Sequence, residues 1–142
     1  MLDEVLAIRK KIKNLDERIF EIRSKIESPK NQIISDMPRG GSGKNILDKL
    51  LDKVKRLETK RTALYVELAS EWHKCEIVFK SCNISERHKE LMKLHYYEGL
   101  SWRYCERNLK RLYPYENWNE NKVFRINRIT KEKIYKKINN NL

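Results

Sequence analysis

Glycine and proline are scarce in this sequence, with four and three copies among 142 residues. Sandwiches and barrels need many tight turns, which these two residues commonly supply. Their scarcity excludes an all-β architecture and predicts an all-α fold. Long apolar runs are missing as well, because no stretch approaches the roughly 18–20 residues of a membrane-spanning helix. We expect one domain of ordinary size or two small ones, and no helix that spans a membrane.

Cysteine and histidine are too few and too scattered to predict a metal site. The three cysteines stand at positions 75, 82 and 105, and the three histidines at positions 73, 88 and 95. These spacings contain no CxxC pair and no HExxH motif. An odd number of cysteines is typical of reduced thiols in a cytoplasm rather than of a disulfide scaffold. We therefore expect no metal, no other cofactor and a cytoplasmic protein.

Catalytic motifs are absent too. The run GGSGK at residues 40–44 lacks the GxxxxGK[ST] spacing of a phosphate-binding loop, and Asn45 stands where that loop needs a hydroxyl. The sequence also has no GxSxG motif and no cysteine with a histidine at a catalytic spacing. It therefore predicts that the protein is not an enzyme.

Positive charge is what the sequence has in excess. The 32 lysines and arginines outnumber the 20 aspartates and glutamates, so the net charge is +12. A field of this sign attracts polyanions, either nucleic acid or an anionic membrane surface. Residues 119–142 hold seven lysines and arginines against two glutamates. The excess is therefore concentrated in the last segment of the sequence.

A long amphipathic helix is predicted from Leu2 to about Glu27. Its apolar residues recur at alternating spacings of three and four, which is the heptad pattern of a coiled coil. They are Val5, Ile8, Ile12, Leu15, Ile19, Ile22 and Ile26. Charged residues fill the positions between them, as expected for a solvated outer face.

A second long helix is predicted from Lys44 or Asn45 to about Phe79. Its apolar residues keep the heptad spacing, and Arg61 interrupts them at one core position. Residues 28–43 contain two prolines and three glycines and form a connector. Two amphipathic helices joined in this way most simply fold back as an antiparallel hairpin.

This predicted hairpin accounts for residues 1–82. Each of its helices has one narrow apolar seam, and neither helix is stable alone. We therefore expect residues 1–82 to form an interaction domain that makes the protein a homodimer.

Residues 83–142 predict a second domain with three shorter helices. The candidate N-caps are Asn83 or Ser85, then Ser101, then Asn119. The second helix has the sequence WRYCERNLKRL, and the third reaches about Ile138. Three short helices that end in a capped pair are typical of a helix-turn-helix domain.

The third of these helices has two distinct faces. At 100° per residue, Val123, Ile126, Thr130 and Ile134 share one side and should pack inward. The opposite side carries Asn121, Phe124, Arg125 and Arg128, with Lys122 near its edge. Arginine can pair with guanine, asparagine with adenine, and lysine can neutralise a phosphate. This face favours binding in the major groove of DNA. Because it also holds asparagines and glutamates beside its cations, we expect no membrane as a partner.

The stretch LMKLHYYEGLSWRYCERNL, followed by NENKVFRINRITKEKI, resembles region 4 of bacterial sigma factors. It is more similar still to the sigma-like helix-turn-helix of phage late-transcription regulators of the ArpU and RinA type. The first half of the chain, with its SDMPRGG connector, resembles small phage proteins of Gram-positive hosts. The resemblance covers about residues 30–138. It implies a phage-encoded, sequence-specific regulator of transcription that acts in the host cytoplasm, with double-stranded DNA and host RNA polymerase as partners.

The resemblance also implies positions for DNA contacts. Ser101, Trp102 and Arg103 match the start of the family's supporting helix. The matches on its recognition helix are Lys122, Arg125, Asn127 and Arg128. Together with the outward face of the third helix, they define a predicted DNA-binding set. Its members are Ser101, Trp102, Arg103, Asn121, Lys122, Phe124, Arg125, Asn127 and Arg128.

Two features depart from the family pattern. Glu106 stands where the family has a small alanine against the recognition helix. Nine residues separate Leu109 from Asn119, where the family has a tight turn of two or three. We expect the longer connection to extend the supporting helix to about Leu112.

Two other functions fit the same pattern. In one, the hairpin is the working surface of an adaptor or anti-sigma-like protein, and the helix-turn-helix grips protein rather than DNA. In the other, the chain is a packaging protein of the small-terminase kind, which also joins a helix-turn-helix to long helices. The long turn and Glu106 favour the adaptor.

Overall fold

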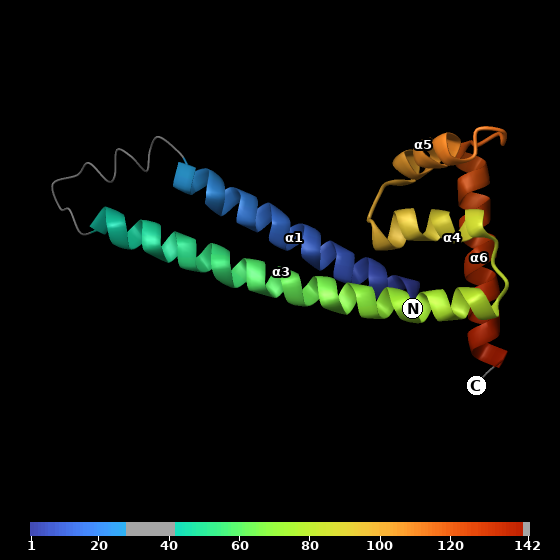
Figure 1. Cartoon of the computed structure of the whole chain (residues 1–142), viewed down its shortest axis with the longest axis horizontal. Helices are drawn as coiled ribbons and strands as arrows, with labels where there is room; N and C mark the ends of the chain where they lie inside the picture. Colours follow the sequence, from blue (N-terminus) through green and yellow to red (C-terminus); the bar gives the residue numbers. More distant parts are fainter. Residues whose placement is uncertain (28–41, 141–142) are drawn as a thin grey trace. The chain divides into compact units, whose positions relative to one another are not determined.

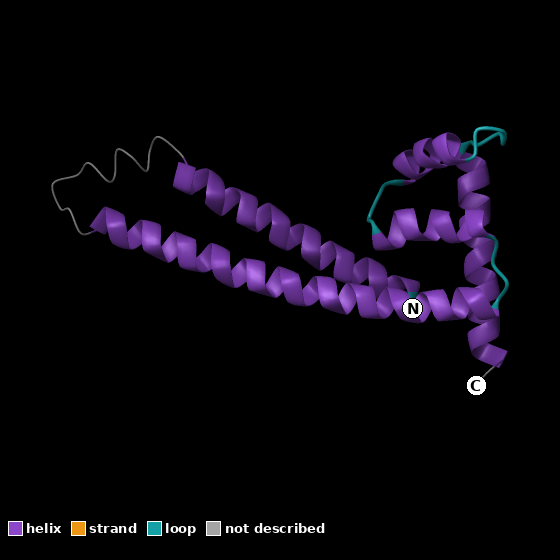
Figure 2. Ribbon diagram, in the orientation of Figure 1, coloured by secondary structure: helices purple, strands orange, loops and turns teal. Residues whose placement is uncertain are grey.

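Helices make up almost all of the computed structural model, which describes residues 1–27 and 42–140 (Figure 1). Within those ranges the chain has no strand (Figure 2). The elements are α1 (Leu2–Glu27), α3 (Ser42–Ser81), α4 (Glu86–Met92), the π-helical turn η1 (Lys93–Tyr97), α5 (Trp102–Leu112) and α6 (Glu120–Asn140). The all-α prediction is therefore confirmed over these residues.

The two long helices lie close to their predicted bounds. Helix α1 matches the prediction, whereas α3 begins at Ser42, two residues before the earlier predicted start. The predicted connector, residues 28–43, lies outside the described residues up to position 41. Helix α3 ends at Ser81, and Asn83 follows in a left-handed conformation, with φ of 53°. Asparagine tolerates that conformation better than most residues do.

The chain divides into two compact units, each with its own packing. We call Met1–Arg9 together with Leu68–Leu142 the terminal unit, and Lys10–Glu67 the central unit. This division differs from the boundary that we expected after residue 82. The reason is that the first turns of α1 and the last turns of α3 bury side chains such as Leu2 and Phe79 in the same unit as the C-terminal helices.

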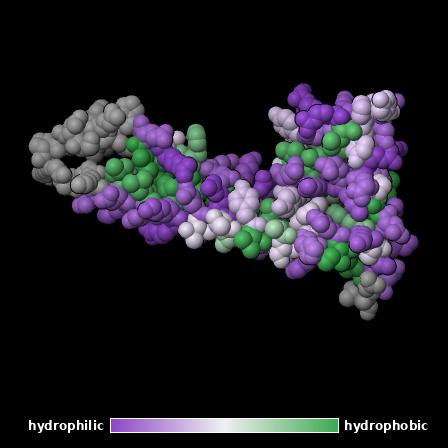
Figure 3. All heavy atoms as spheres, viewed as in Figure 1, coloured by the Kyte–Doolittle hydropathy of each residue, from purple (hydrophilic) through white to green (hydrophobic). Residues whose placement is uncertain are grey.

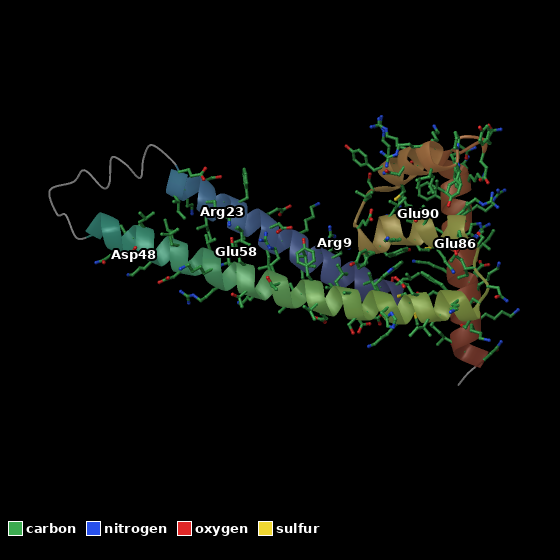
Figure 4. All side chains as sticks on the ribbon, viewed as in Figure 1. Arg9, Arg23, Asp48, Glu58, Glu86 and Glu90 are labelled. Atoms are coloured by element: carbon green, nitrogen blue, oxygen red, sulfur yellow. The ribbon has the colours of Figure 1, made fainter. Side chains whose placement is uncertain are left out.

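The central unit contains an antiparallel pair of helical segments. Its apolar cluster consists of Ile19, Ile22, Val54 and Leu57, with Leu15, Ile26 and Leu50 packed against it. Arg23 pairs with Glu58 (Figure 4). Arg61 pairs with Asp16 at 2.7 Å. The partner numbers change in opposite directions along α1 and α3, so these segments are antiparallel. In Figure 3, hydrophobic residues gather between the two segments and hydrophilic residues cover the outer edge of α3.

Arg61, which interrupts the apolar stripe of α3, is held by Asp16 rather than buried without a partner. The hydrogen bond that Arg61 donates to the Asp16 carboxylate raises the pKa of Arg61.

The terminal unit has a core built from α4, η1, α5, α6 and the turn before α6. Its cluster of buried residues consists of Leu91, Leu94, Cys105, Leu109, Trp118, Val123 and Ile126. Three side chains cap the helices at their predicted positions. They are Ser85 before α4, Ser101 before α5 and Asn119 before α6. Each accepts a hydrogen bond from a backbone N–H that the first turn of a helix leaves unpaired.

All three cysteines are free thiols. Burial raises the pKa of the Cys75 thiol to about 11 and that of the Cys105 thiol to about 12. These two cysteines are therefore protonated packing residues at neutral pH, because thiolate is the reactive form.

Candidate nucleic-acid interface

Helix α6 is amphipathic in the way that its sequence predicts. The buried residues on its inner face are Val123, Ile126, Thr130 and Ile134. The hydroxyl of Thr130 is fully buried and has no hydrogen-bond partner among the described residues. Because the inner face is fixed in the core, the opposite face of the helix is held toward solvent.

The exposed face of α6 carries two arginines. Arg125 and Arg128 are exposed, and no described residue forms an ion pair or hydrogen bond with either. Asn121 is also exposed, one turn before Arg125. The Phe124 side chain is 42% exposed, and the rest of its ring packs edge-on against Trp102 at 5.7 Å between centroids.

Lys122 belongs to the predicted set but is not a free cation. Its side chain is half-buried, and its Nζ lies 4.4 Å from the centre of the Trp118 ring. The same Nζ lies 3.3 Å from Oε2 of Glu116, in the turn before α6. Lys122 is therefore positioned by an aromatic face and by a carboxylate.

Asn127 faces the interior of the terminal unit rather than the exposed face. Its Oδ1 accepts a hydrogen bond of 3.0 Å from the buried Tyr96 hydroxyl. An asparagine that pairs with adenine needs its amide oxygen as well as its nitrogen. Because that oxygen is directed at Tyr96, the Asn127 side chain would have to turn away from the core to pair with adenine, and its observed role is to join α6 to η1.

The three predicted residues at the start of α5 have different surroundings. Ser101 caps the helix, because its hydroxyl accepts from the backbone N–H of Tyr104 at 3.4 Å. Trp102 is half-buried and stacks on the imidazole of His95, with 3.6 Å between ring centroids. Only Arg103 is exposed and without a partner in the described part of the chain.

The connection between α5 and α6 is long and ordered by a tryptophan. Helix α5 extends to Leu112, as expected, so that residues 113–119 form the turn. Trp118 inserts its ring into the core and donates from Nε1 to the carbonyl of Tyr113 at 3.3 Å. This long turn is thus closed by its own buried side chain.

Two hollows flank the first turns of α6. One, of about 450 Å³, is lined by Asn117, Asn119, Asn121, Lys122 and Arg125. The other, of about 390 Å³, is lined by Arg87, His88, Glu116, Trp118, Lys122, Arg125, Ile126 and Ile129.

Arg87, which lies on α4, was not predicted from the sequence, since nothing in the local spacing connects it to α6. The polar run ENWNEN before the third helix was the available signal for the asparagines.

The local charge around the second hollow is positive. Burial lowers the pKa of His88, and the nearby charges of Lys133, Arg87 and Lys122 lower it further. His88 is therefore neutral at pH 7, and the positive charge at this surface comes from lysine and arginine.

Comparisons with known protein families, with curated proteins and with solved structures find no significant match to this chain. No helix in residues 1–27 or 42–140 is long and apolar enough to cross a membrane. The same residues contain no group of three or more histidine, cysteine or acidic side chains placed to hold a metal ion.

Proposed function

We propose that the protein is a sequence-specific DNA-binding regulator of transcription in which α5 and α6 act as a helix-turn-helix. In this proposal α6 lies in the major groove and the start of α5 faces the phosphate backbone. The observation that carries it is the pair of exposed guanidinium groups of Arg125 and Arg128, which have no partner in residues 1–27 and 42–140, on a helix whose opposite face is buried.

The spacing of the two arginines suits a DNA surface. Residues three apart share a face of a helix and lie roughly 4.5 Å apart along its axis. Consecutive bases of one strand are separated by about 3.4 Å. Arg125 and Arg128 can therefore reach neighbouring base pairs, with Asn121 one turn earlier. In this proposal Arg103 contacts a phosphate from α5.

The resemblance to phage late-transcription regulators supports the biological setting of this proposal. We propose a phage-encoded regulator in the cytoplasm of its bacterial host, with host RNA polymerase as a second partner. The hairpin formed by α1 and α3 would pair two copies of the chain. The apolar side chains of Ile46, Leu47 and Leu51 support this step, because they are 39–46% exposed at the start of α3. A dimer would remove them from water.

The test is a binding titration against genomic DNA fragments from the source of the protein, with unrelated competitor DNA present. It is run at about 50 and about 200 mM salt, because contacts to several phosphates make affinity fall steeply with salt. We expect one fragment to survive competition and its affinity to fall by orders of magnitude at the higher salt. Weak binding that any competitor removes would reject the proposal.

A charge-matched pair of variants locates the contact. Arg125→Ala with Arg128→Ala should weaken specific binding at least about tenfold, because each arginine–guanine pair contributes about 1–3 kcal/mol. Arg18→Ala with Arg56→Ala removes two exposed arginines from the central unit and should leave specific binding nearly unchanged. Equal losses in the two proteins would mean that only net charge matters.

The adaptor hypothesis remains the second candidate because apolar side chains are exposed on the central unit. Besides the start of α3, Val66 is 68% exposed and Phe20 is 72% exposed. A contact made by such residues depends on apolar burial and should change little between the two salt concentrations.

The packaging hypothesis predicts a ring rather than a dimer, and sedimentation of the full chain separates these two assemblies.

A further inference from the structure

Glu116, in the turn between α5 and α6, forms two ion pairs, and the proposed DNA contacts use neither of them. Its two carboxylate oxygens are held by cations from two different helices. Oε1 pairs with Nη1 of Arg87 on α4, and Oε2 lies 3.3 Å from Nζ of Lys122 on α6. The carboxylate is thus placed between two cations, in the way that an anion is held at a binding site.

The surroundings of this carboxylate form a shaped hollow rather than an open surface. Glu116 and Lys122 are each about three-quarters covered, with side-chain exposures of 24% and 25%. Trp118 and Ile126 supply an apolar wall, which lowers the local dielectric and strengthens charge pairing there. Arg125 also lines the hollow and has no partner among the described residues. Two cations therefore hold the carboxylate, and a third lines the same hollow.

We propose that Arg87, Lys122 and Arg125 form a binding site for a phosphate group, and that Glu116 occupies it as an internal competitor. Two oxygens of a phosphate can take the places of the two carboxylate oxygens, and a phosphate brings a further oxygen for Arg125. The Glu116 side chain then leaves the hollow and turns toward solvent. The backbone of residues 113–119 stays in place, because Trp118 remains packed in the core.

The source of the phosphate is the backbone of bound DNA, and this step rests on the proposed function. Because Arg125 lines this hollow and also belongs to the exposed face of α6, a phosphate held here would lie beside the bases that α6 contacts. Glu116 would weaken binding to all sequences alike, since a phosphate carries no sequence information. The long turn thereby limits non-specific binding by a protein with a net charge of +12.

The experiment compares the full-length wild type with Glu116→Gln and with Glu120→Gln. Glu120 is exposed in the first turn of α6, and no described residue pairs with it, so its substitution makes the same charge change nearby. Each protein is titrated with inorganic phosphate at constant ionic strength, and the amide of Lys122 and the indole N–H of Trp118 are followed by NMR. We expect saturable shifts of both signals and an affinity about fivefold to tenfold higher in Glu116→Gln than in the other two proteins.

Arg87→Ala provides an independent check from the other side of the site. Combined with Glu116→Gln, it should remove most of the gain in phosphate affinity. Equal phosphate affinity in Glu116→Gln and Glu120→Gln would overturn the proposal, as would shifts that spread over unrelated residues. A Glu116→Gln protein that has lost its fold would show collapsed amide dispersion. In that case the single variant Arg87→Ala is compared with wild type. The proposal then requires that Arg87→Ala bind phosphate more weakly than wild type does.

A DNA titration then distinguishes the backbone of DNA from free phosphate. The slope of log affinity against log salt should be steeper by about 1 in Glu116→Gln than in Glu120→Gln, as expected for about one more phosphate contact. Equal slopes would reject DNA as the source and leave a site for free phosphate. If wild type binds no DNA at all, the proposed function fails while the phosphate titration still decides the site.

Discussion

The indole ring of Trp102 lies flat against the imidazole of His95, with 3.6 Å between ring centroids and 12° between planes. The Nδ1 atom of the same imidazole lies 2.8 Å from the carbonyl oxygen of Leu100. A carbonyl can only accept, so Nδ1 carries the proton. Burial lowers the pKa of His95, and this effect outweighs the opposing hydrogen bond to Leu100. His95 is therefore a neutral packing residue that joins η1 to α5.

The first prediction is that the terminal unit loses stability on acidification. The pKa of His95 lies below its ordinary value of 6.5 in the folded state, and the pKa of His88 is lowered as well. The unfolded chain therefore binds more protons as the pH falls through about 6.5, so the free energy of unfolding decreases from there toward the folded pKa values. Urea unfolding at about pH 7.5 and about pH 5.5 measures the loss.

His95→Asn is the informative variant, because its amide nitrogen can replace Nδ1 but does not titrate. It should lose less stability than wild type between the two pH values, and the remaining loss should come largely from His88. His73→Asn changes an exposed histidine on α3 and should follow wild type. A wild-type stability that does not change between the two pH values would contradict the assignment.

Much of the fold could be predicted because it depends on local pattern. The caps at Ser85, Ser101 and Asn119 lie where the sequence places them, since a cap involves only the next three residues. The buried face of α6 follows from helical periodicity alone. The start of α3 was predicted two residues late, because the glycine-rich GGSGK run favours a loop on propensity.

The rest could not be predicted because it depends on which elements pack together. Asn127 lies near the boundary between the two faces of α6, and only its distance to Tyr96 shows that it points inward. Arg87 and Glu116 meet across 29 positions of sequence, which no spacing rule encodes. The same holds for the first turns of α1, which share a unit with the C-terminal helices.

The second prediction concerns Trp118, which closes the turn before α6. Its side chain is 5% exposed and belongs to the core cluster of the terminal unit. Trp118→Ala should lower the free energy of unfolding by about 3–5 kcal/mol, because it removes a large buried ring and leaves a cavity. Trp118→Phe should cost much less, since it keeps most of the apolar volume and loses the hydrogen bond to Tyr113. Denaturant unfolding measures both changes.

Tyr115 provides the matched control in the same turn. Its side chain is fully exposed, so Tyr115→Ala should change the free energy of unfolding by less than about 0.5 kcal/mol. If Trp118→Ala were as mild as Tyr115→Ala, the turn would not be anchored in the core.

The third prediction concerns Gly99, where an added side chain would destabilise the fold in two ways, through backbone strain and through a clash with Arg9. This residue has φ of 73°, a left-handed conformation that an L side chain adopts only with strain. A Cβ atom there would lie 2.9 Å from both Cγ and Nε of Arg9, so the arginine side chain would also have to move. Gly99→Ala should therefore lower the free energy of unfolding by about 1–2 kcal/mol from the backbone alone, plus the cost of displacing Arg9. In an Arg9→Ala background only the backbone cost should remain, and a double-mutant cycle of urea unfolding measures the difference. Equal costs in the two backgrounds would show that Arg9 moves aside freely, and no cost in either would contradict the left-handed conformation at this turn.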